Sequence, residues 1–348
     1  MSRDVQSKEF VVAFDPPCRL ADTLKSIWQG LLRRTSIDVN DNFFDLGGDA
    51  WLAVRLFEEI SRVLGIELSP VSIYHMPTIA SLAAVLQRET RPTVSPLTPL
   101  KTGDGGLPFF LVHGCGSTVL EFHDLVKHIR YSHSIYGMQA RGVDGIEEPF
   151  DAIEDLSKYH LEAIKRLQPE GPYLLAGYSS GGLVALEMAR RLTKGGDKIA
   201  LLAMIDSYPP LNLLRGRDFV KLKVRRRIHY IRAKIRKQSS GGFWHRGEGI
   251  ETGASVPMPV TRSMPRYQVL DFEALQSYQL RYYDGNVRFI KAQSEWTFPL
   301  DPAAVWAHRV RGLRIDTVPG DHLGIVTTHF RSLADTLSRY LEEAAGEG

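Results

Sequence analysis

From about residue 106 onward, short apolar runs alternate with amphipathic helical stretches, and this alternation limits the possible folds more than any other feature of the chain. The apolar runs predict strands at 108–114, 134–138, 173–177, 199–206, 287–292 and 313–318. Helical spacing of apolar residues is clearest at 154–167 and 181–194. This order is typical of βαβ units around a mostly parallel sheet. The long gap at 207–284 shows no clear strand, and an insertion of this size between strands predicts a lid.

A separate helical unit precedes this region. Apolar residues recur every three or four positions in two stretches, at Leu20, Leu24, Ile27 and Leu31, and at Leu52, Leu56, Ile60 and Val63. This spacing gives each helix one apolar face. A short third helix is expected near 71–75 and a fourth at 79–86. The sequence therefore predicts a small four-helix bundle at 15–90, a Pro- and Gly-rich linker at 91–106 that merges into the first strand, and a second domain at 97–345 with its lid at about 208–275.

Composition excludes several classes of protein. With 43% hydrophobic and 24% charged residues, the chain can bury a core, and no apolar run approaches the roughly 18–20 residues that span a bilayer. Two cysteines, Cys18 and Cys115, are too few for a disulfide framework or a four-thiolate zinc site, and no metal is expected. The N-terminus lacks a secretory signal, so a cytoplasmic protein is expected. The net charge of +3 implies no nucleic-acid partner, and no stable membrane insertion is expected.

The strand expected at 173–177 enters a glycine-rich turn that leads into a helix. The turn places Ser179 between Gly177 and Gly181 in a Gly-x-Ser-x-Gly pattern. Between a strand and a helix, this pattern predicts the nucleophile turn of an α/β-hydrolase domain, with the serine hydroxyl exposed above the sheet. Glycines are needed because the helix begins too close to the strand to leave room for a Cβ. Ser180 also lies in the motif, but only Ser179 holds the middle position.

A serine nucleophile needs a base, and the candidate partners follow at the ends of later strands. Asp206 ends the strand at 199–206, and His322 lies in the loop after 313–318, which gives the order serine, acid, histidine. Asp206 and His322 are therefore the expected acid and base for Ser179. The rival acids are Asp316 and Asp321, and the rival histidine is His113.

A second glycine-rich loop follows the strand at 108–114. In this fold such a loop supplies one backbone N–H of an oxyanion hole, beside the N–H of the residue after the nucleophile. The donors are therefore expected to be the backbone N–H groups of Cys115 and Ser180. A cysteine nucleophile at Cys115 is a minor alternative, because no strand–turn–helix presents that residue and no neighbouring base is evident.

The N-terminal unit contains the stretch Asp41-Asn42-Phe43-Phe44-Asp45-Leu46-Gly47-Gly48-Asp49-Ala50-Trp51-Leu52. It resembles the phosphopantetheine site of the carrier proteins of nonribosomal peptide and polyketide synthases, over about 70 residues. In that family the cofactor 4'-phosphopantetheine is attached to a serine, where this chain has Ala50. We interpret Ala50 as an engineered substitution that keeps the carrier unmodified; a naturally silent carrier is the alternative.

The second domain resembles the type I thioesterases that end such synthases. The matching pieces are His113-Gly114, the turn around Ser179, the strand end at Asp206 and Pro319-Gly320-Asp321-His322. The resemblance implies a peptidyl or acyl thioester substrate, upstream condensation and adenylation domains, and a phosphopantetheinyl transferase as partners.

The expected function is release of a carrier-bound chain through Ser179, by hydrolysis or by cyclisation. A general serine esterase or lipase with a helical appendage is one alternative. A non-catalytic carrier-docking module is another.

The segment 215–237 is strongly basic, with eleven Lys or Arg and the single acid Asp218. Apolar residues at helical spacing make it amphipathic. The first interpretation is a lid helix with a basic solvated face. The second is docking of the acidic carrier loop at Asp38, Asp41, Asp45 and Asp49, and contact with a membrane surface or nucleic acid is a third.

Overall fold

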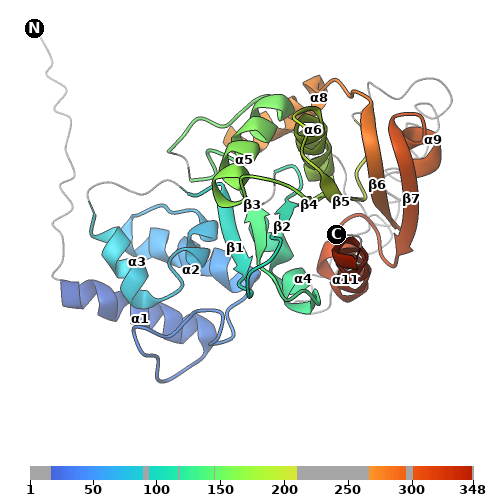
Figure 1. The fold of residues 1–348 in the computed structure, drawn as a ribbon. Helices are drawn as coiled ribbons and strands as arrows, with labels where there is room; N and C mark the ends of the chain where they lie inside the picture. The colour runs from blue at the N-terminus through green and yellow to red at the C-terminus, as the bar shows by residue number, and fades with distance from the viewer. Residues whose placement is uncertain are drawn as a thin grey trace, which may run out of the picture. The chain divides into compact units, whose positions relative to one another are not determined.

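The chain divides into two compact units, residues 1–92 and 93–348 (Figure 1). The computed structural model describes residues 17–88, 94–116, 118–144, 146–209, 266–294 and 301–346. The division falls at the start of the stretch expected to be a linker. The basic segment 215–237 and most of the expected lid lie outside the described residues. No helix in the described ranges is long and apolar enough to cross a bilayer.

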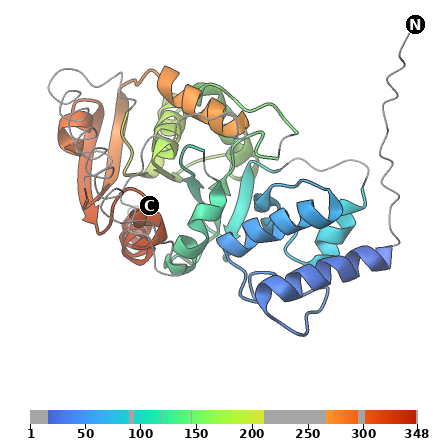
Figure 2. The same ribbon diagram turned by 180° about the vertical axis from the view of Figure 1, so that it is seen from behind.

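The first unit is a helical bundle, drawn in blue to cyan in Figure 2. Its elements are α1 (Pro17–Leu32), α2 (Ala50–Leu64), the 3-10 helix η1 (Pro70–Tyr74) and α3 (Ile79–Leu86). The side chain of Asp49 caps α2 by accepting a hydrogen bond from the backbone N–H of Leu52 at 2.8 Å. All four predicted helical segments are present, and the third is a single 3-10 stretch rather than an α-helix.

Phe43 and Gly48 of the carrier-like motif are buried in the core of this bundle. Phe43 is fully buried and meets Trp28 edge to face at 5.1 Å, while Phe44 stacks on Tyr74 at 4.9 Å. A Cβ on Gly48 would lie 2.4 Å from the Phe43 ring. The motif therefore fixes the loop that precedes α2, and with it the position of Ala50.

Within its described residues, the second unit contains a seven-stranded sheet in the order β1-β3-β2-β4-β5-β6-β7, in which only the pairing of β1 with β3 is antiparallel. The strands are β1 (Leu97–Lys101), β2 (Phe109–Val112), β3 (Ile135–Met138), β4 (Tyr173–Tyr178), β5 (Ile199–Ile205), β6 (Tyr283–Ala292) and β7 (Val310–Val318). All six predicted strands are present. β1 lies within the expected linker, and β6 begins at Tyr283, earlier than its apolar run indicates.

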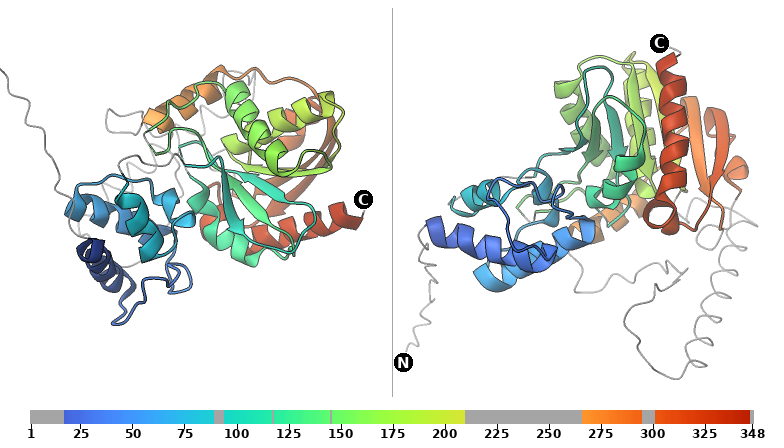
Figure 3. Two further views of the ribbon diagram at one scale, coloured as in Figure 1. Left: turned by 60° about the vertical axis from the view of Figure 1, so that its left-hand side comes forward. Right: turned by 90° about the horizontal axis from the view of Figure 1, so that it is seen from below.

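Helices cover both faces of the sheet, so that its strands are buried on two sides (Figure 3). One buried cluster includes residues of α5 (Ile153–Leu167), α6 (Ser180–Lys194) and α8 (Arg266–Ser277). The other includes residues of α4 (His123–His128) and α11 (Phe330–Gly346). The shorter elements are η2 (Val119–Phe122), α9 (Pro302–Trp306) and α10 (Gly324–Thr327). This arrangement leaves the carboxyl ends of the parallel strands at one edge, where the candidate site lies.

Candidate active site

Ser179 lies at the sharp turn between β4 and α6. Its backbone has φ 54° and ψ −122°, a conformation that non-glycine residues rarely adopt. The backbone N–H of Ser179 donates to the carbonyl oxygen of Ile205 at 2.9 Å, which ties the turn to the end of β5. Strain of this kind is held in place by the surrounding structure and is concentrated at functional sites.

The glycines around Ser179 allow backbone segments to approach one another closely. A Cβ on Gly181 would lie 2.3 Å from the carbonyl oxygen of His113, and one on Gly182 would lie 1.9 Å from the hydroxyl of Ser207. A Cβ on Gly177 would meet the carbonyl oxygen of Gly181 at 2.1 Å. The space argument made from the sequence therefore applies to all three glycines.

The structure brings Ser179, His322 and Asp206 together from three strand ends. His322 Nε2 lies 3.0 Å from Ser179 Oγ, and His322 Nδ1 lies 2.8 Å from Asp206 Oδ2. The side chains of His322 and Asp206 are only 12% and 6% exposed. Because a carboxylate only accepts, Nδ1 carries the proton in the neutral ring, which leaves Nε2 free to accept the hydroxyl proton of Ser179.

Asp206 is held rigidly at the end of β5. Its backbone N–H donates to the carbonyl oxygen of Ile290 at 2.7 Å, and its Oδ1 accepts from the backbone N–H of Ala292 at 3.1 Å. Its φ of 45° turns the chain out of the strand. One carboxylate oxygen is thus fixed by β6 and the other faces His322.

Tyr178, the residue before Ser179, also positions His322. Its hydroxyl donates to the backbone carbonyl of His322 at 2.6 Å, and the two rings stack with centroids 5.0 Å apart. Burial raises the pKa of Tyr178 well above its ordinary value, so it stays a neutral donor. This contact was not predicted, because no sequence pattern indicates that a tyrosine hydroxyl binds a backbone carbonyl in a loop 144 positions away.

The loop after β2 presents the backbone N–H of Cys115. Within the described residues, neither this N–H nor that of Ser180 at the start of α6 binds an acceptor. The preceding peptide is anchored by Glu121, whose Oε1 accepts from the N–H of Gly114 at 2.7 Å. Burial, reinforced by Asp271, raises the pKa of the Cys115 thiol to about 12, which disfavours the alternative of a thiolate nucleophile.

His113, the rival histidine, is committed to this loop. Its Nδ1 donates to the carbonyl oxygen of Gly114 at 2.7 Å, and its Nε2 accepts from the N–H of Ala140 at 3.2 Å. Burial lowers the pKa of His113 to about 4, so the ring is neutral near pH 7. Both ring nitrogens are therefore occupied by structural hydrogen bonds.

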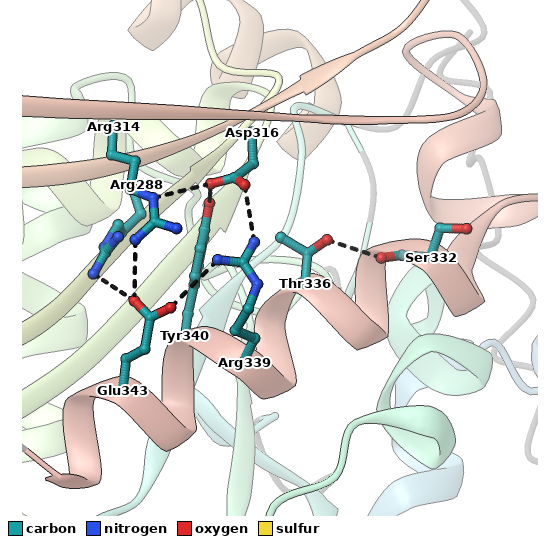
Figure 4. A network of polar contacts seen from close by, with 8 residues as sticks. All are labelled: Arg288, Arg314, Asp316, Ser332, Thr336, Arg339, Tyr340 and Glu343. Carbon is teal, nitrogen blue, oxygen red and sulfur yellow. Dashed lines mark hydrogen bonds and ion pairs between the residues drawn. The ribbon is translucent and has the colours of Figure 1, made fainter.

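The rival acids are also engaged elsewhere. Asp321 Oδ1 accepts from the backbone N–H of Gly324 at 2.7 Å, near the start of α10. Asp316 faces α11, where it accepts from the Tyr340 hydroxyl at 2.5 Å and from Arg339 at 2.9 Å (Figure 4). In the same network Glu343 binds Arg288 at 2.6 Å. Asp316 thus joins β7 to the C-terminal helix.

We expect Asp316→Asn to lower the free energy of unfolding by about 1–3 kcal/mol near pH 7, because it weakens charge-assisted hydrogen bonds. Burial alone would raise the pKa of Asp316, but its bonds to Tyr340 and Arg339 outweigh burial and hold the pKa below its usual value. This contribution is present above the unfolded pKa of about 3.9 and is lost as the pH falls through the folded value. Urea unfolding of both chains at pH 7 and in acid should therefore show a difference that shrinks in acid. An undiminished difference in acid would contradict the assignment.

Ala50 is half-buried and is the first residue of α2, immediately after the capping residue Asp49. Its neighbour Trp51 is 66% exposed and lies under the guanidinium of Arg55. A methyl group has no oxygen through which a phosphodiester could form. The chain as it stands therefore does not fit phosphopantetheine at this position.

The acidic residues near Ala50 also serve the loop itself. Asp41 Oδ2 accepts from the N–H of Asp38 at 2.8 Å, and Asp38 Oδ1 accepts from the N–H of Asn40 at 2.9 Å. With the cap at Asp49, three of the four acids proposed for docking have local structural roles. Docking to the segment 215–237 stays a prediction, because that segment lies outside the described residues.

Comparisons with known proteins match both units. Residues 108–238 match the family model described as "Thioesterase domain", and residues 22–86 match "Phosphopantetheine attachment site". The first marks a domain of hydrolases that act on thioesters, and the second marks a family that carries phosphopantetheine. These matches agree with the expected helical carrier unit and α/β-hydrolase unit.

Similar curated proteins are large synthetases. The chain is 29% identical over 311 residues to a dimodular nonribosomal peptide synthase of Bacillus subtilis, covering 84% of this chain and 13% of that protein. It is 38% identical over 187 residues to malpibaldin synthetase of Mortierella alpina, covering 53% of this chain and 3% of that protein. It is 36% identical over 188 residues to indigoidine synthase of Streptomyces lavendulae, covering 54% of this chain and 15% of that protein. The chain thus spans only a small part of each relative.

Solved structures support the fold. The four-domain nonribosomal peptide synthetase holo-AB3403 is 22% identical with a TM-score of 0.56, covering 97% of this chain and 27% of that one. The type II thioesterase BorB from the borrelidin biosynthetic cluster is 16% identical with a TM-score of 0.50. The match covers 72% of this chain and 100% of that one. At these identities the likeness concerns the fold alone.

Proposed function

We propose that this chain, which joins a domain of the phosphopantetheine attachment family to a thioesterase domain, releases a peptidyl or acyl chain from a thioester by way of Ser179. The observation that carries the proposal is the pair of hydrogen bonds that joins Ser179 to His322 and His322 to Asp206, with Ser179 itself on a strained turn. Such a pair of bonds is what a serine needs to become nucleophilic at neutral pH.

In the first half of the reaction, His322 Nε2 takes the proton of Ser179 as Oγ bonds to the thioester carbonyl carbon. Asp206 stabilises the imidazolium that forms. The negative oxygen of the tetrahedral intermediate accepts from the backbone N–H groups of Cys115 and Ser180. The carbon–sulfur bond then breaks, the proton on His322 passes to the departing sulfur, and the chain remains as an ester on Ser179.

In the second half, His322 takes a proton from the incoming nucleophile. If water attacks the ester carbonyl, a free acid leaves. If an amine or hydroxyl of the bound chain attacks, a ring leaves. In both cases the proton returns from His322 to Ser179 Oγ, which regenerates the enzyme. Both products follow from the same residues, and mass analysis of the released product distinguishes them.

A fluorophosphonate probe tests the proposal directly. It should phosphonylate Ser179 stoichiometrically, and the modified chain should no longer hydrolyse an acyl-pantetheine thioester. Absence of labelling would instead support a non-catalytic docking module. Faster turnover of simple oxygen esters than of pantetheine thioesters would support a general esterase or lipase.

The carrier-like unit implies partners for the complete assembly. We propose that upstream condensation and adenylation domains build the chain to be released, and that a phosphopantetheinyl transferase modifies a carrier of this family. The proposal places the reaction in the cytoplasm, where coenzyme A, the donor of the arm, is available.

Ala50→Ser is expected to restore the attachment site, because the surrounding loop is intact and only the hydroxyl is lacking. Incubation with a phosphopantetheinyl transferase and coenzyme A should add one phosphopantetheine, localised by peptide mapping to position 50. The parent chain, which keeps its other serines, is the matched control and should gain nothing. If Ala50→Ser also gains nothing, a naturally silent carrier becomes the better interpretation.

A further inference from the structure

Helix α8 contacts the loop that carries Cys115. Asp271 Oδ2 accepts from the backbone N–H of Gly116 at 3.3 Å, and Gln268 Nε2 donates to the carbonyl oxygen of Gly116 at 2.8 Å. Gln268 and Asp271 lie one helical turn apart, on the same side of α8. The two side chains thus bind the two polar groups of a single residue, Gly116.

These bonds complete a series of anchors along the loop. Glu121 holds the N–H of Gly114, and His113 holds the carbonyl of Gly114. Two residues further along the loop, Asp271 accepts a hydrogen bond from the N–H of Gly116. The N–H of Cys115 lies between these anchored groups and, among the described residues, has no acceptor of its own. Anchors on both sides therefore determine where this N–H points.

Gly116 needs external support to keep its conformation. Its φ is 70°, and a glycine at such a value has no side chain to restrict its rotation. A Cβ on Gly116 would lie 3.7 Å from the Cβ and Cγ of Gln268, which is ordinary van der Waals contact. The stem of Gln268 therefore packs on the glycine while its amide binds the carbonyl.

Asp271 is an unusual residue for a merely structural contact. Burial raises its pKa to about 7, so keeping it ionised at neutral pH has a cost that its bond to Gly116 only partly offsets. It lies beside a small cavity that is also lined by Gly114 and Ser180. The carboxyl group thus binds the residue next to Cys115 and lines the same cavity as Ser180; Cys115 and Ser180 are the two expected oxyanion donors.

We propose that Gln268 and Asp271 are positioning residues that aim the Cys115 N–H at the oxyanion by holding Gly116 between them. The inference rests on the proposed function and assigns to α8 a role in stabilising the transition state. Oxyanion donors act through position, and misplacement by about 1 Å can cost on the order of 100-fold in rate. The bond to Asp271 needs an acceptor oxygen rather than a negative charge.

The test measures kcat and KM of the full chain with a small acyl-pantetheine thioester. Asp271→Leu and Gln268→Met should each lower kcat about tenfold or more, while KM stays within about twofold. Asp271→Asn, which keeps an acceptor oxygen, should retain most of the activity. Glu273→Leu, at an exposed position on the same helix, is the matched control and should behave like the parent chain.

The outcomes separate the two proposals. If the parent chain neither turns over nor labels with fluorophosphonate, the proposed function fails and the inference fails with it. If the parent is active and Asp271→Leu keeps its kcat, or loses only in KM, the inference alone is overturned. Melting curves are recorded for every variant. Should Asp271→Leu lose its cooperative transition, Gln268→Met alone decides.

Discussion

Ser179→Ala is expected to lower thioester turnover by at least about 10⁴-fold, because the covalent route through the serine ester is lost. The turn itself should persist, since alanine keeps the Cβ and the backbone N–H bond to Ile205. Single-turnover hydrolysis of an acyl-pantetheine thioester measures the loss. Intact-mass analysis should at the same time show no acyl or phosphonyl adduct on the variant.

Ser180→Ala provides the matched control. The Ser180 side chain has no assigned role, and its backbone N–H, the expected oxyanion donor, is kept in the variant. Activity within a few-fold of the parent chain is expected. Undiminished release by Ser179→Ala, or an equal loss in Ser180→Ala, would refute the assignment of Ser179.

Asp206→Asn is expected to reduce kcat by about 10⁴-fold with a small change in KM. An asparagine amide can donate to His322 Nδ1, which would place the ring proton on Nε2, where it faces Ser179 and prevents proton transfer. Stopped-flow measurement of acyl-serine formation should locate the loss in the first half of the reaction.

Asp316→Asn is the control for Asp206→Asn, because it removes the charge of the rival acid in the same unit. Asp316 binds Tyr340 and Arg339 on α11, whereas the carboxylate bound to His322 is Asp206, so turnover should be unchanged while stability falls. If Asp316→Asn lost activity and Asp206→Asn did not, the acid would have to be reassigned.

The sequence predicted the strands and the site geometry because both depend on local patterns. Six apolar runs became strands, and parallel strands place their carboxyl ends at one edge. Ser179, Asp206 and His322 each follow such a run, so their meeting could be expected from chain order alone.

The remaining features depend on side chains that meet across long stretches of sequence. Asp316 looked like a rival acid because a strand pattern does not show that its side chain reaches α11. Gln268 and Asp271 come from the insertion whose apolar pattern predicted no strand, and their partner Gly116 lies more than 150 positions away. Neither residue belongs to a recognisable motif.

The bond from Tyr178 to the His322 carbonyl has a mechanical consequence. Tyr178 and Ser179 are consecutive, so the strand that leads to the nucleophile also forms a hydrogen bond with the loop that carries the base. Because of this bond, a displacement of β4 that moves Ser179 also pulls on the backbone of His322. The Tyr178 hydroxyl therefore couples the position of the base to that of the nucleophile.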